Sequence, residues 1–237
     1  MEKSTKLLVG AAAAVCVGVV LFVFFLDRST HSSREAALQI YEGMKSQLAQ
    51  TITTGQQRLE TVIADPRAAA DEDCHIVLAE ALERHADEHD VFLRIRPDGI
   101  LDCTPAGAPA DEIDLSSRLY FDLAVENDGP AVGEFLVGRV SNEPVLAVSN
   151  VLRNEDGSIG YVFVTGLKLN WLKSVIETAA NEYGLVVELH DAAGVPLSYF
   201  EDSSALRTFG QSTRAELVRL PILPDQTDVH VVILEQL

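Results

Sequence analysis

The sequence is poor in basic and aromatic residues. It has 18 Lys+Arg against 36 Asp+Glu, a formal net charge of -18, and 6% aromatic residues over 237 positions. The length corresponds to one or two ordinary domains. Because a strongly acidic surface repels phosphate backbones, the composition excludes a general nucleic-acid-binding protein.

Catalytic motifs are also missing. The sequence contains no G-x-S-x-G elbow, no Walker loop and no paired C-x-x-C. His85-Ala-Asp-Glu-His89 matches the H-x-x-E-H pattern of one group of zinc peptidases, but no obvious helix supplies a third ligand. We therefore interpret it as an exposed helix end, and we predict no catalytic residues, no metal, no cofactor and no enzyme activity.

One long apolar run is present. Residues 7–26 carry no charged side chain, and as a helix they would cover the roughly 30 Å of a bilayer core. Lys3 and Lys6 precede the run, which favours a cytoplasmic N-terminus. A cleaved signal peptide is the alternative, but the run is long for one and no A-x-A site follows. We expect a single-pass protein of the inner (cytoplasmic) membrane, with residues 1–6 inside and the bulk of the chain periplasmic or extracellular.

Two of the three cysteines, Cys74 and Cys103, lie beyond the apolar run. In an oxidising compartment such a pair is more often bridged than free. Two separately buried thiols are the alternative. We predict a Cys74–Cys103 disulfide.

A long amphipathic helix is predicted after the apolar run, over residues 27–66. Its apolar residues recur every three or four positions, Gly55 is its one weak point, and Asp65-Pro66 ends it. The stripe consists of Leu38, Tyr41, Met44, Leu48, Ile52, Leu59 and Val62. Asp71 or Asp73 can cap a second, shorter helix.

Helices and strands alternate along the rest of the chain. The patterns predict a hairpin around Pro97-Asp-Gly99, a helix over 118–127, three consecutive antiparallel strands over 132–139, 144–152 and 160–167, and a helix over 169–180. A smaller unit follows, with strands over 185–191 and 195–200, an irregular stretch, and a strand over 229–234. The expected class is α+β.

Several of these segments together resemble a known family. In order they are the cysteine pair that flanks the first hairpin, Arg118-Leu-Tyr-Phe121, and Val132-Gly-Glu-Phe-Leu-Val-Gly-Arg139. The order is similar to that of the double Cache extracytoplasmic sensor domains of bacterial diguanylate cyclases, histidine kinases and chemoreceptors. The resemblance implies tandem PAS-like modules with antiparallel sheets, a membrane-distal one over 67–181 and a smaller second one over 182–237.

The resemblance also implies a ligand pocket in the membrane-distal module. Arg118 and Tyr120 are its candidate contacts, because a guanidinium pairs well with a carboxylate and an aromatic ring closes the wall. The alternative is that Arg118 pairs with Asp114 and Tyr120 is core. Phe135, Ser149 and Thr165 complete the candidate set.

Two departures from the family bear on the ligand. Ser117 stands where relatives commonly have Asp, and Thr165 and Gly166 stand where amino-acid-binding members place another Asp. An α-ammonium group would therefore lack its anionic partner, and a small carboxylate is the ligand class that stays open.

The function that we expect is that of a membrane-anchored sensor domain. It would bind a small molecule, transmit a signal through a homodimer or a separate partner, and have no output domain of its own, since the sequence stops at Leu237. The alternative is a ligand-free Cache-like protein that docks on another envelope receptor.

Overall fold

A computed structural model describes the backbone of residues 2–190, 214–223 and 226–236, and the side chains of 33–190, 215–222 and 229–235. Helices and antiparallel sheets make up the described chain, which confirms the predicted α+β class and the long N-terminal helix. Two compact units are present, Ser46–Lys173 and Met1–Lys45 together with Ser174–Leu237. The predicted boundaries between modules stay predictions.

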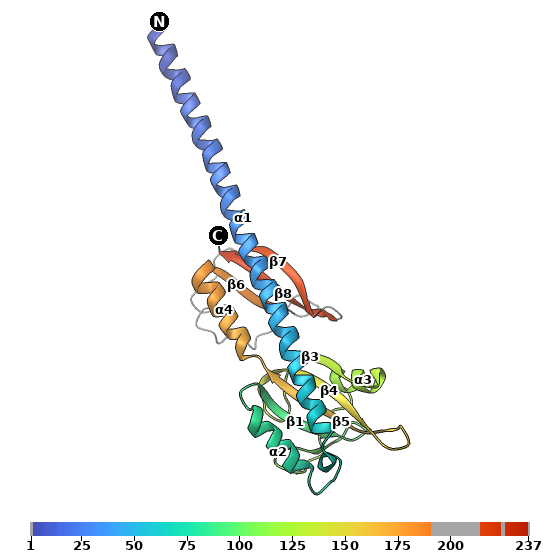
Figure 1. Cartoon of the computed structure of the whole chain (residues 1–237). Coiled ribbons are helices and arrows are strands. Elements are labelled where there is room, and N and C mark those ends of the chain that lie inside the picture. Colours follow the sequence, from blue (N-terminus) through green and yellow to red (C-terminus); the bar gives the residue numbers. More distant parts are fainter. Residues whose placement is uncertain (1, 191–213, 224–225, 237) are drawn as a thin grey trace. The chain divides into compact units, whose positions relative to one another are not determined.

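The first helix, α1, runs from Glu2 to Ile63 (Figure 1). From residue 33 onward most of the predicted apolar stripe is buried, namely Tyr41, Met44, Leu48, Leu59 and Val62. Ile52 is half-buried, and Leu38 is exposed, contrary to the prediction. Pro66 opens a short 3-10 helix, η1 (Pro66–Ala68), which Asp65 caps by accepting a hydrogen bond from the backbone N–H of Arg67 at 3.0 Å.

Gly55 has a packing role in α1. A Cβ built on Gly55 would lie 2.5 Å from a methyl carbon of Leu167. The missing side chain therefore lets a sheet residue approach the helix backbone, which explains a glycine inside a helix where it costs about 1 kcal/mol relative to alanine.

A five-stranded antiparallel sheet forms the centre of the Ser46–Lys173 unit. Its strand order is β2-β1-β5-β4-β3. The strands are β1 (His89–Ile95), β2 (Leu101–Cys103), β3 (Ala131–Val137), β4 (Pro144–Arg153) and β5 (Ile159–Lys168). The hairpin and the three consecutive strands were predicted. The pairing of β1 with β5, in which Phe92 lies opposite Thr165, joins segments far apart in the sequence.

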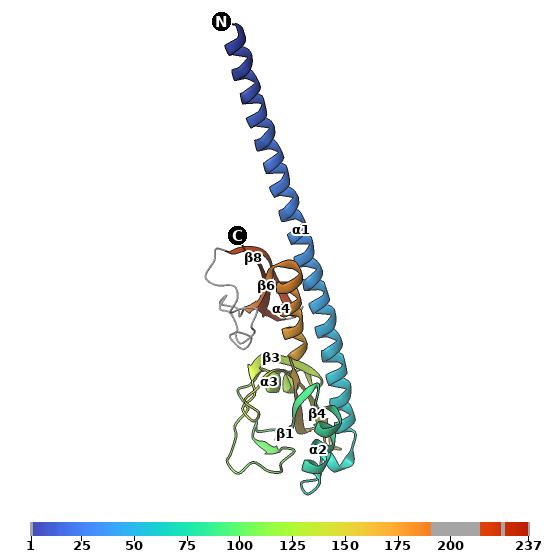
Figure 2. The ribbon, with the colours of Figure 1, turned by 90° about the vertical axis from the view of Figure 1, so that its left-hand side faces the viewer.

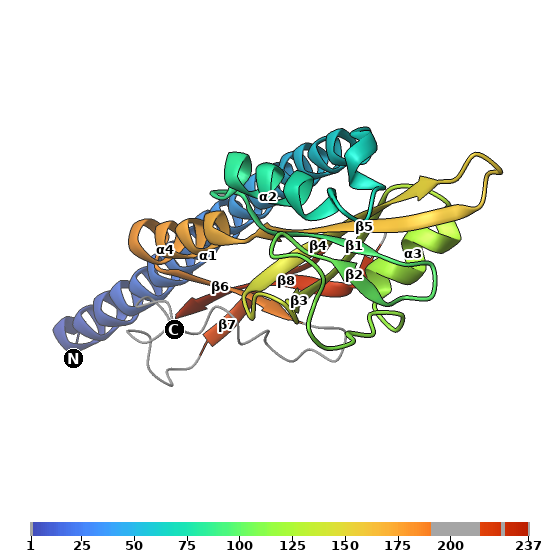
Figure 3. The same cartoon turned by 90° about the horizontal axis from the view of Figure 1, so that it is seen from below.

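Different helices cover the two faces of this sheet. On one face α2 (Cys74–His85) and the end of α1 bury Leu59, Leu78 and Phe163. On the other face α3 (Leu119–Asn127) buries Tyr120, Phe121 and Val164. Figures 2 and 3 show α2 and α3 on opposite sides of the sheet. Residues 163 and 164 point to opposite faces because side chains alternate along a strand.

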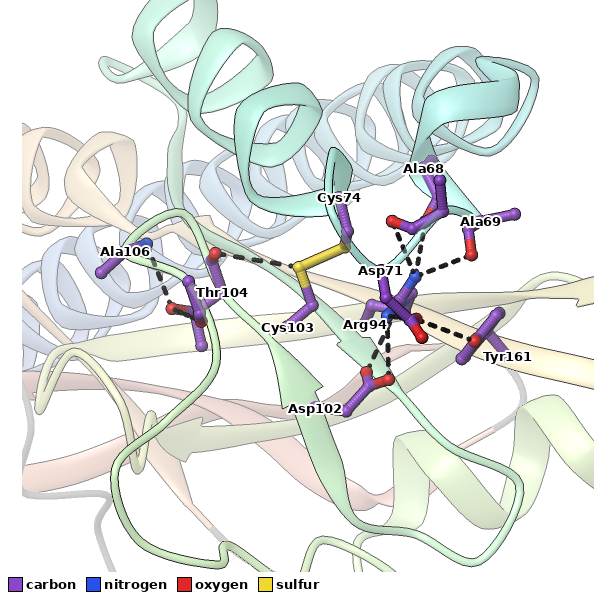
Figure 4. Close-up of a disulfide and its surroundings, with 12 residues drawn as sticks. Ala68, Ala69, Asp71, Cys74, Arg94, Asp102, Cys103, Thr104, Ala106 and Tyr161 are labelled. Carbon is purple, nitrogen blue, oxygen red and sulfur yellow. Dashed lines mark hydrogen bonds and ion pairs between the residues drawn. A yellow bond between two sulfur atoms is a disulfide. The ribbon is translucent and has the colours of Figure 1, made fainter.

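The predicted disulfide is present and lies beside a buried arginine (Figure 4). Cys74, at the start of α2, is bonded to Cys103, at the end of β2. Arg94, on β1, is only 2% exposed and donates to the Asp71 and Asp102 carboxylates at 2.8 and 2.9 Å. It also donates to the carbonyl oxygens of Ala68 and Ala69, at 3.1 and 3.0 Å.

The other unit contains a three-stranded sheet of order β6-β8-β7. Its strands are β6 (Leu185–His190), β7 (Arg214–Leu223) and β8 (Gln226–Gln236), and the helix α4 (Asn170–Tyr183) precedes them. The Tyr41 hydroxyl of α1 donates to the carbonyl oxygen of Pro221 at 2.8 Å. The predicted strand over 195–200 lies outside the described residues.

The expectation of an irregular stretch before the last strand is wrong over Arg214–Leu223, which forms β7. Pro221 obscured this strand, because proline lacks an N–H and is excluded from most central strands. Among the described residues β7 pairs with β8 alone, and its register shifts between Pro221 and Leu223. The irregular register accommodates the missing donor.

Within the described part of the chain, no helix combines the length and the apolar character that a bilayer crossing requires. The apolar run over 7–26 falls outside the residues whose side chains are described. Its insertion into a membrane stays a prediction.

Candidate functional site

A small pocket lies between the start of α3 and the sheet, in the Ser46–Lys173 unit. Its free volume is about 30 Å³. Aliphatic side chains form most of its wall, and two arginines and a tyrosine supply its polar groups. The lining residues are Val91, Leu93, Leu115, Arg118, Tyr120, Leu136, Gly138, Arg139, Val140, Val145, Ala147, Val164 and Gly166.

The backbone at the start of α3 places Arg118 and Tyr120 at this pocket. Arg118 is the N-cap residue, in an extended conformation with φ -89° and ψ 133°. Its carbonyl oxygen accepts from the N–H groups of Phe121 and Asp122, at 2.9 and 3.1 Å, and so starts the helix. The guanidinium then projects from the end of α3, where it is partly exposed.

Tyr120 is held from two sides. Its carbonyl oxygen accepts from the Ser149 hydroxyl at 2.6 Å. A Cβ built on Gly133 would lie 2.5 Å from the Tyr120 Cβ. The glycine of the Val-Gly-x-Phe strand therefore allows α3 to approach β3 closely, and Ser149 secures the backbone rather than lining the pocket.

The polar groups of the pocket are mainly cationic. Among the described residues no carboxylate pairs with the Arg118 guanidinium, whereas the Arg139 Nη1 donates to the Asp114 carbonyl oxygen at 2.6 Å. The Asp114 carboxylate accepts instead from the backbone N–H of Ser116 at 2.8 Å. Of the alternative reading, the pairing of Arg118 with Asp114 is not found among the described residues, whereas Tyr120 is a core residue as it expected. Arg118 is available to an anion.

The Tyr120 hydroxyl stays protonated. Burial raises the pKa of Tyr120 to about 12, and Glu134 also raises it, while Arg118 and Arg139 act in the opposite direction. Glu134 does not line the pocket, and its Oε2 is buried with no hydrogen-bond partner among the described residues. At neutral pH the pocket therefore offers a neutral O–H donor and two guanidinium groups.

Three of the five predicted ligand contacts, Phe135, Ser149 and Thr165, do not line this pocket. Thr165 alternates with the lining residues Val164 and Gly166, so it faces the α1 and α2 side. Its hydroxyl donates to the Val91 carbonyl oxygen at 2.7 Å and accepts from the His89 Nδ1 at 2.8 Å. Phe135 is buried and alternates in the same way with Leu136, which lines the pocket. A ligand-binding role for Phe135, Ser149 and Thr165 stays a prediction.

Arg139 is the polar lining residue that sequence reasoning missed. It follows Gly138 in the Gly-Arg pair that ends the Val-Gly-x-Phe segment. That pair was a signal of the family resemblance, but only the fold brings the end of β3 next to the start of α3.

The expectation that H-x-x-E-H is an exposed helix end is wrong at its last residue, because α2 ends at His85 whereas His89 begins β1 and is buried. The His85 and His89 rings are 6.0 Å apart between centroids, and the His89 Nδ1 is bonded to Thr165. Within the described residues no three His, Cys, Asp or Glu side chains converge to hold a metal ion.

His89 makes the stability of this unit depend on acid. Burial, aided by the charge of Arg58, lowers the pKa of His89 to about 4. In the unfolded chain the pKa of a histidine is near 6.5. The contribution of neutral His89 to stability is therefore complete above about pH 6.5 and is lost as the pH falls toward 4. We expect the free energy of unfolding to fall by on the order of 3 kcal/mol over that interval. Denaturant unfolding followed by circular dichroism at stepwise pH measures it.

The His89→Gln variant should lose most of this acid dependence. The control is His75→Gln, since His75 is an exposed residue of α2. An equal acid response in the wild type and in His89→Gln would contradict the assignment.

Comparisons with known proteins establish the fold of the chain. No protein-family model matches the sequence, and no curated protein matches it. Solved structures do match. The ligand-binding domain of the Pseudomonas fluorescens chemoreceptor CtaA, in complex with L-isoleucine, gives a TM-score of 0.59 at 14% identity, covering 89% of this chain and 93% of that chain.

Two further structures have a similar fold. The ligand-binding domain of the Pseudomonas aeruginosa amino acid chemoreceptor PctC, in complex with GABA, gives a TM-score of 0.59 at 17% identity, covering 85% of this chain and 99% of that chain. The extracellular domain of a candidate histidine kinase, vpHK1S-Z8, gives 0.58 at 12% identity, covering 88% and 95%.

The chain therefore has the fold of the ligand-binding domains of chemoreceptors and histidine kinases, consistent with a Cache sensor domain. The resemblance predicted from sequence is confirmed at the level of the fold. These neighbours are sensor domains rather than enzymes, which fits the expectation of a protein that binds and does not catalyse.

Proposed function

We propose that this protein is a membrane-anchored extracytoplasmic sensor domain, with tandem Cache modules, that binds a small carboxylate in the pocket at Arg118. The observation that carries the proposal is the Arg118 guanidinium, which has no carboxylate partner among the described residues and stands over an aliphatic pocket. The fold shared with ligand-binding domains of chemoreceptors supports it.

The pocket chemistry suits a monocarboxylate with a short aliphatic body. A guanidinium binds a carboxylate through two parallel N–H···O bonds, and the Tyr120 hydroxyl can add a third. The free volume is about 30 Å³, close to the share of one water molecule in the liquid, so only the smallest carboxylates, acetate and propionate, suit the pocket, and lining side chains must move to admit them.

The proposal is tested by a thermal-shift screen of the full chain in detergent. The panel contains acetate, propionate, succinate, amino acids and amines. A carboxylate at one hundred times its dissociation constant should stabilise the chain by roughly 2.7 kcal/mol, and Arg118→Ala should abolish the effect. Arg153→Ala is the control, because Arg153 is a partly exposed residue near the β4–β5 turn that does not line the pocket.

An amino acid response would overturn the ligand class. Several neighbours are complexes with amino acids. Glu134 lies outside the pocket lining but acts on the Tyr120 hydroxyl beside it, and its buried Oε2 can accept from an ammonium group. If amino acids stabilise the chain and Glu134→Gln abolishes the effect, the ligand is an amino acid rather than a simple carboxylate.

A second candidate function is that of a ligand-free interaction protein that docks on another envelope receptor. The small volume of the pocket favours it, since apolar side chains already fill most of the space. Absence of any stabilising compound in the panel would support this candidate over the sensor.

A further inference from the structure

A second cavity lies between α2 and the end of α1, on the sheet face opposite the pocket at Arg118. Its free volume is about 100 Å³, larger than that of the Arg118 pocket. Its lining residues are Arg58, Thr61, Val62, Asp65, Val77, Ala81, Arg84 and His85. All of them belong to the Ser46–Lys173 unit.

Basic groups outnumber acidic ones in the lining of this cavity. The lining contains three basic side chains, those of Arg58, Arg84 and His85, and one carboxylate, that of Asp65. The Asp65 carboxylate already binds the Arg67 Nη2 at 2.8 Å. Arg58 and Arg84 are therefore the charges that a bound molecule would meet.

The two arginines are held to different degrees. Arg58 has a side chain only 20% exposed, and both of its terminal nitrogens bind the Glu88 carboxylate. Arg84 is 59% exposed, and its Nη2 lies 3.5 Å from the Glu80 carboxylate. The Arg58 guanidinium is therefore fixed at the cavity, whereas the Arg84 guanidinium can change rotamer to contact a ligand.

The floor of the cavity is apolar. Val62, Val77 and Ala81 form it, and each is at most 5% exposed. These residues belong to the core that α1 and α2 share. A cationic rim above an aliphatic floor matches a molecule with a charged head and a short hydrocarbon body.

We propose that this cavity binds a small organic anion, a short-chain carboxylate whose head group lies between Arg58, Arg84 and His85 and whose aliphatic part contacts Val62, Val77 and Ala81. Guanidinium groups bind carboxylates in two-pronged fashion, and the apolar floor excludes water from the chain of the ligand. The site is independent of the pocket at Arg118.

Binding at this site is linked to the protonation of His85. Burial and then the charges of Arg58 and Arg84 lower the pKa of His85, while Glu88 raises it. His89 is the other ring beside it, and Asp65 lies in the same cavity lining. An anion would offset the two arginine charges and raise the pKa of His85, so the affinity should increase as the pH falls.

The test uses the full chain in detergent, with histidine labelled with ¹³C and butyrate as the probe. His85→Gln assigns the NMR signal of His85. We expect butyrate to shift that signal and raise its midpoint pH, and we expect at least threefold tighter binding at pH 6 than at pH 8. Arg84→Gln should weaken binding at least fivefold.

Two controls separate this site from its surroundings and from the Arg118 pocket. Arg96→Gln changes an exposed arginine that lines neither cavity, and Arg118→Ala removes the other anion site. Both should leave the His85 response to butyrate unchanged.

Three outcomes would overturn the proposal. One is a His85 signal that butyrate does not move. Another is an equal response to inorganic phosphate, which would show that the apolar floor takes no part. The third is a butyrate response that survives Arg84→Gln or disappears in Arg118→Ala.

Discussion

Arg94→Leu is expected to lower the free energy of unfolding by about 3 to 5 kcal/mol, the range for breaking a buried ion pair from one side. The substitution leaves the Asp102 carboxylate, whose side chain is 19% exposed, without its cation. It also removes the donor to the carbonyl oxygens of Ala68 and Ala69, and a guanidinium that lies 4.1 Å from the centre of the Tyr161 ring. Urea unfolding followed by circular dichroism measures the change.

Arg96→Leu is the matched control, because Arg96 directly follows β1 and pairs only with Asp98, two residues away. Its side chain is 45% exposed, and exposed pairs of this kind contribute about 0 to 1 kcal/mol. Equal losses for Arg94→Leu and Arg96→Leu would show that the buried cluster has no special role.

Replacing Cys74 and Cys103 by alanine is expected to lower the free energy of unfolding by about 3 to 4 kcal/mol. The disulfide joins residues separated by 29 positions, and in the chain-entropy model a loop of that size accounts for this loss. Unfolding of the Cys74→Ala, Cys103→Ala chain, compared with that of the wild type with and without reductant, measures it. A reduced wild type as stable as the oxidised one would contradict the prediction.

Arg94 and the disulfide restrain the same two segments. Asp71 lies three residues before Cys74, and Asp102 directly precedes Cys103. The Arg94 ion pairs and the disulfide therefore both connect residues 71–74, at the start of α2, to β2 (Figure 4). Neighbouring interactions are seldom additive. A double-mutant cycle of Arg94→Leu with the cysteine pair should therefore give a coupling energy of about 0.5 kcal/mol or more.

Local patterns in the sequence were sufficient for most elements. The apolar stripe of α1, the alternation in β1, β4 and β5, and the turn at Pro97-Asp-Gly99 all depend on residues within a few positions of one another. Gly99 has φ +86°, which this turn requires and which glycine adopts without strain. Two of the candidate site residues, Arg118 and Tyr120, also followed from a short motif at the start of a helix.

The tertiary structure decided which residues meet. The pairing of β1 with β5 sets which strand residues face α3. Because side chains alternate along a strand, Val164 lies in the pocket whereas the next residue, Thr165, lies on the other face beside His89. Similarly, Arg139 reaches the pocket only because β3 lies beside α3, and Pro221 is accommodated where the register of β7 against β8 shifts.

The sequence by itself therefore determined the order of helices and strands from α1 to β6 and the cysteine pair, because these depend on local periodicity and on short motifs, and the family resemblance implied the arginine that starts α3. The register between distant strands, the face on which each side chain lies and the two cavities required the folded chain. Contacts between segments 70 residues apart leave no periodic signal in a single sequence, and they depend on how whole elements pack.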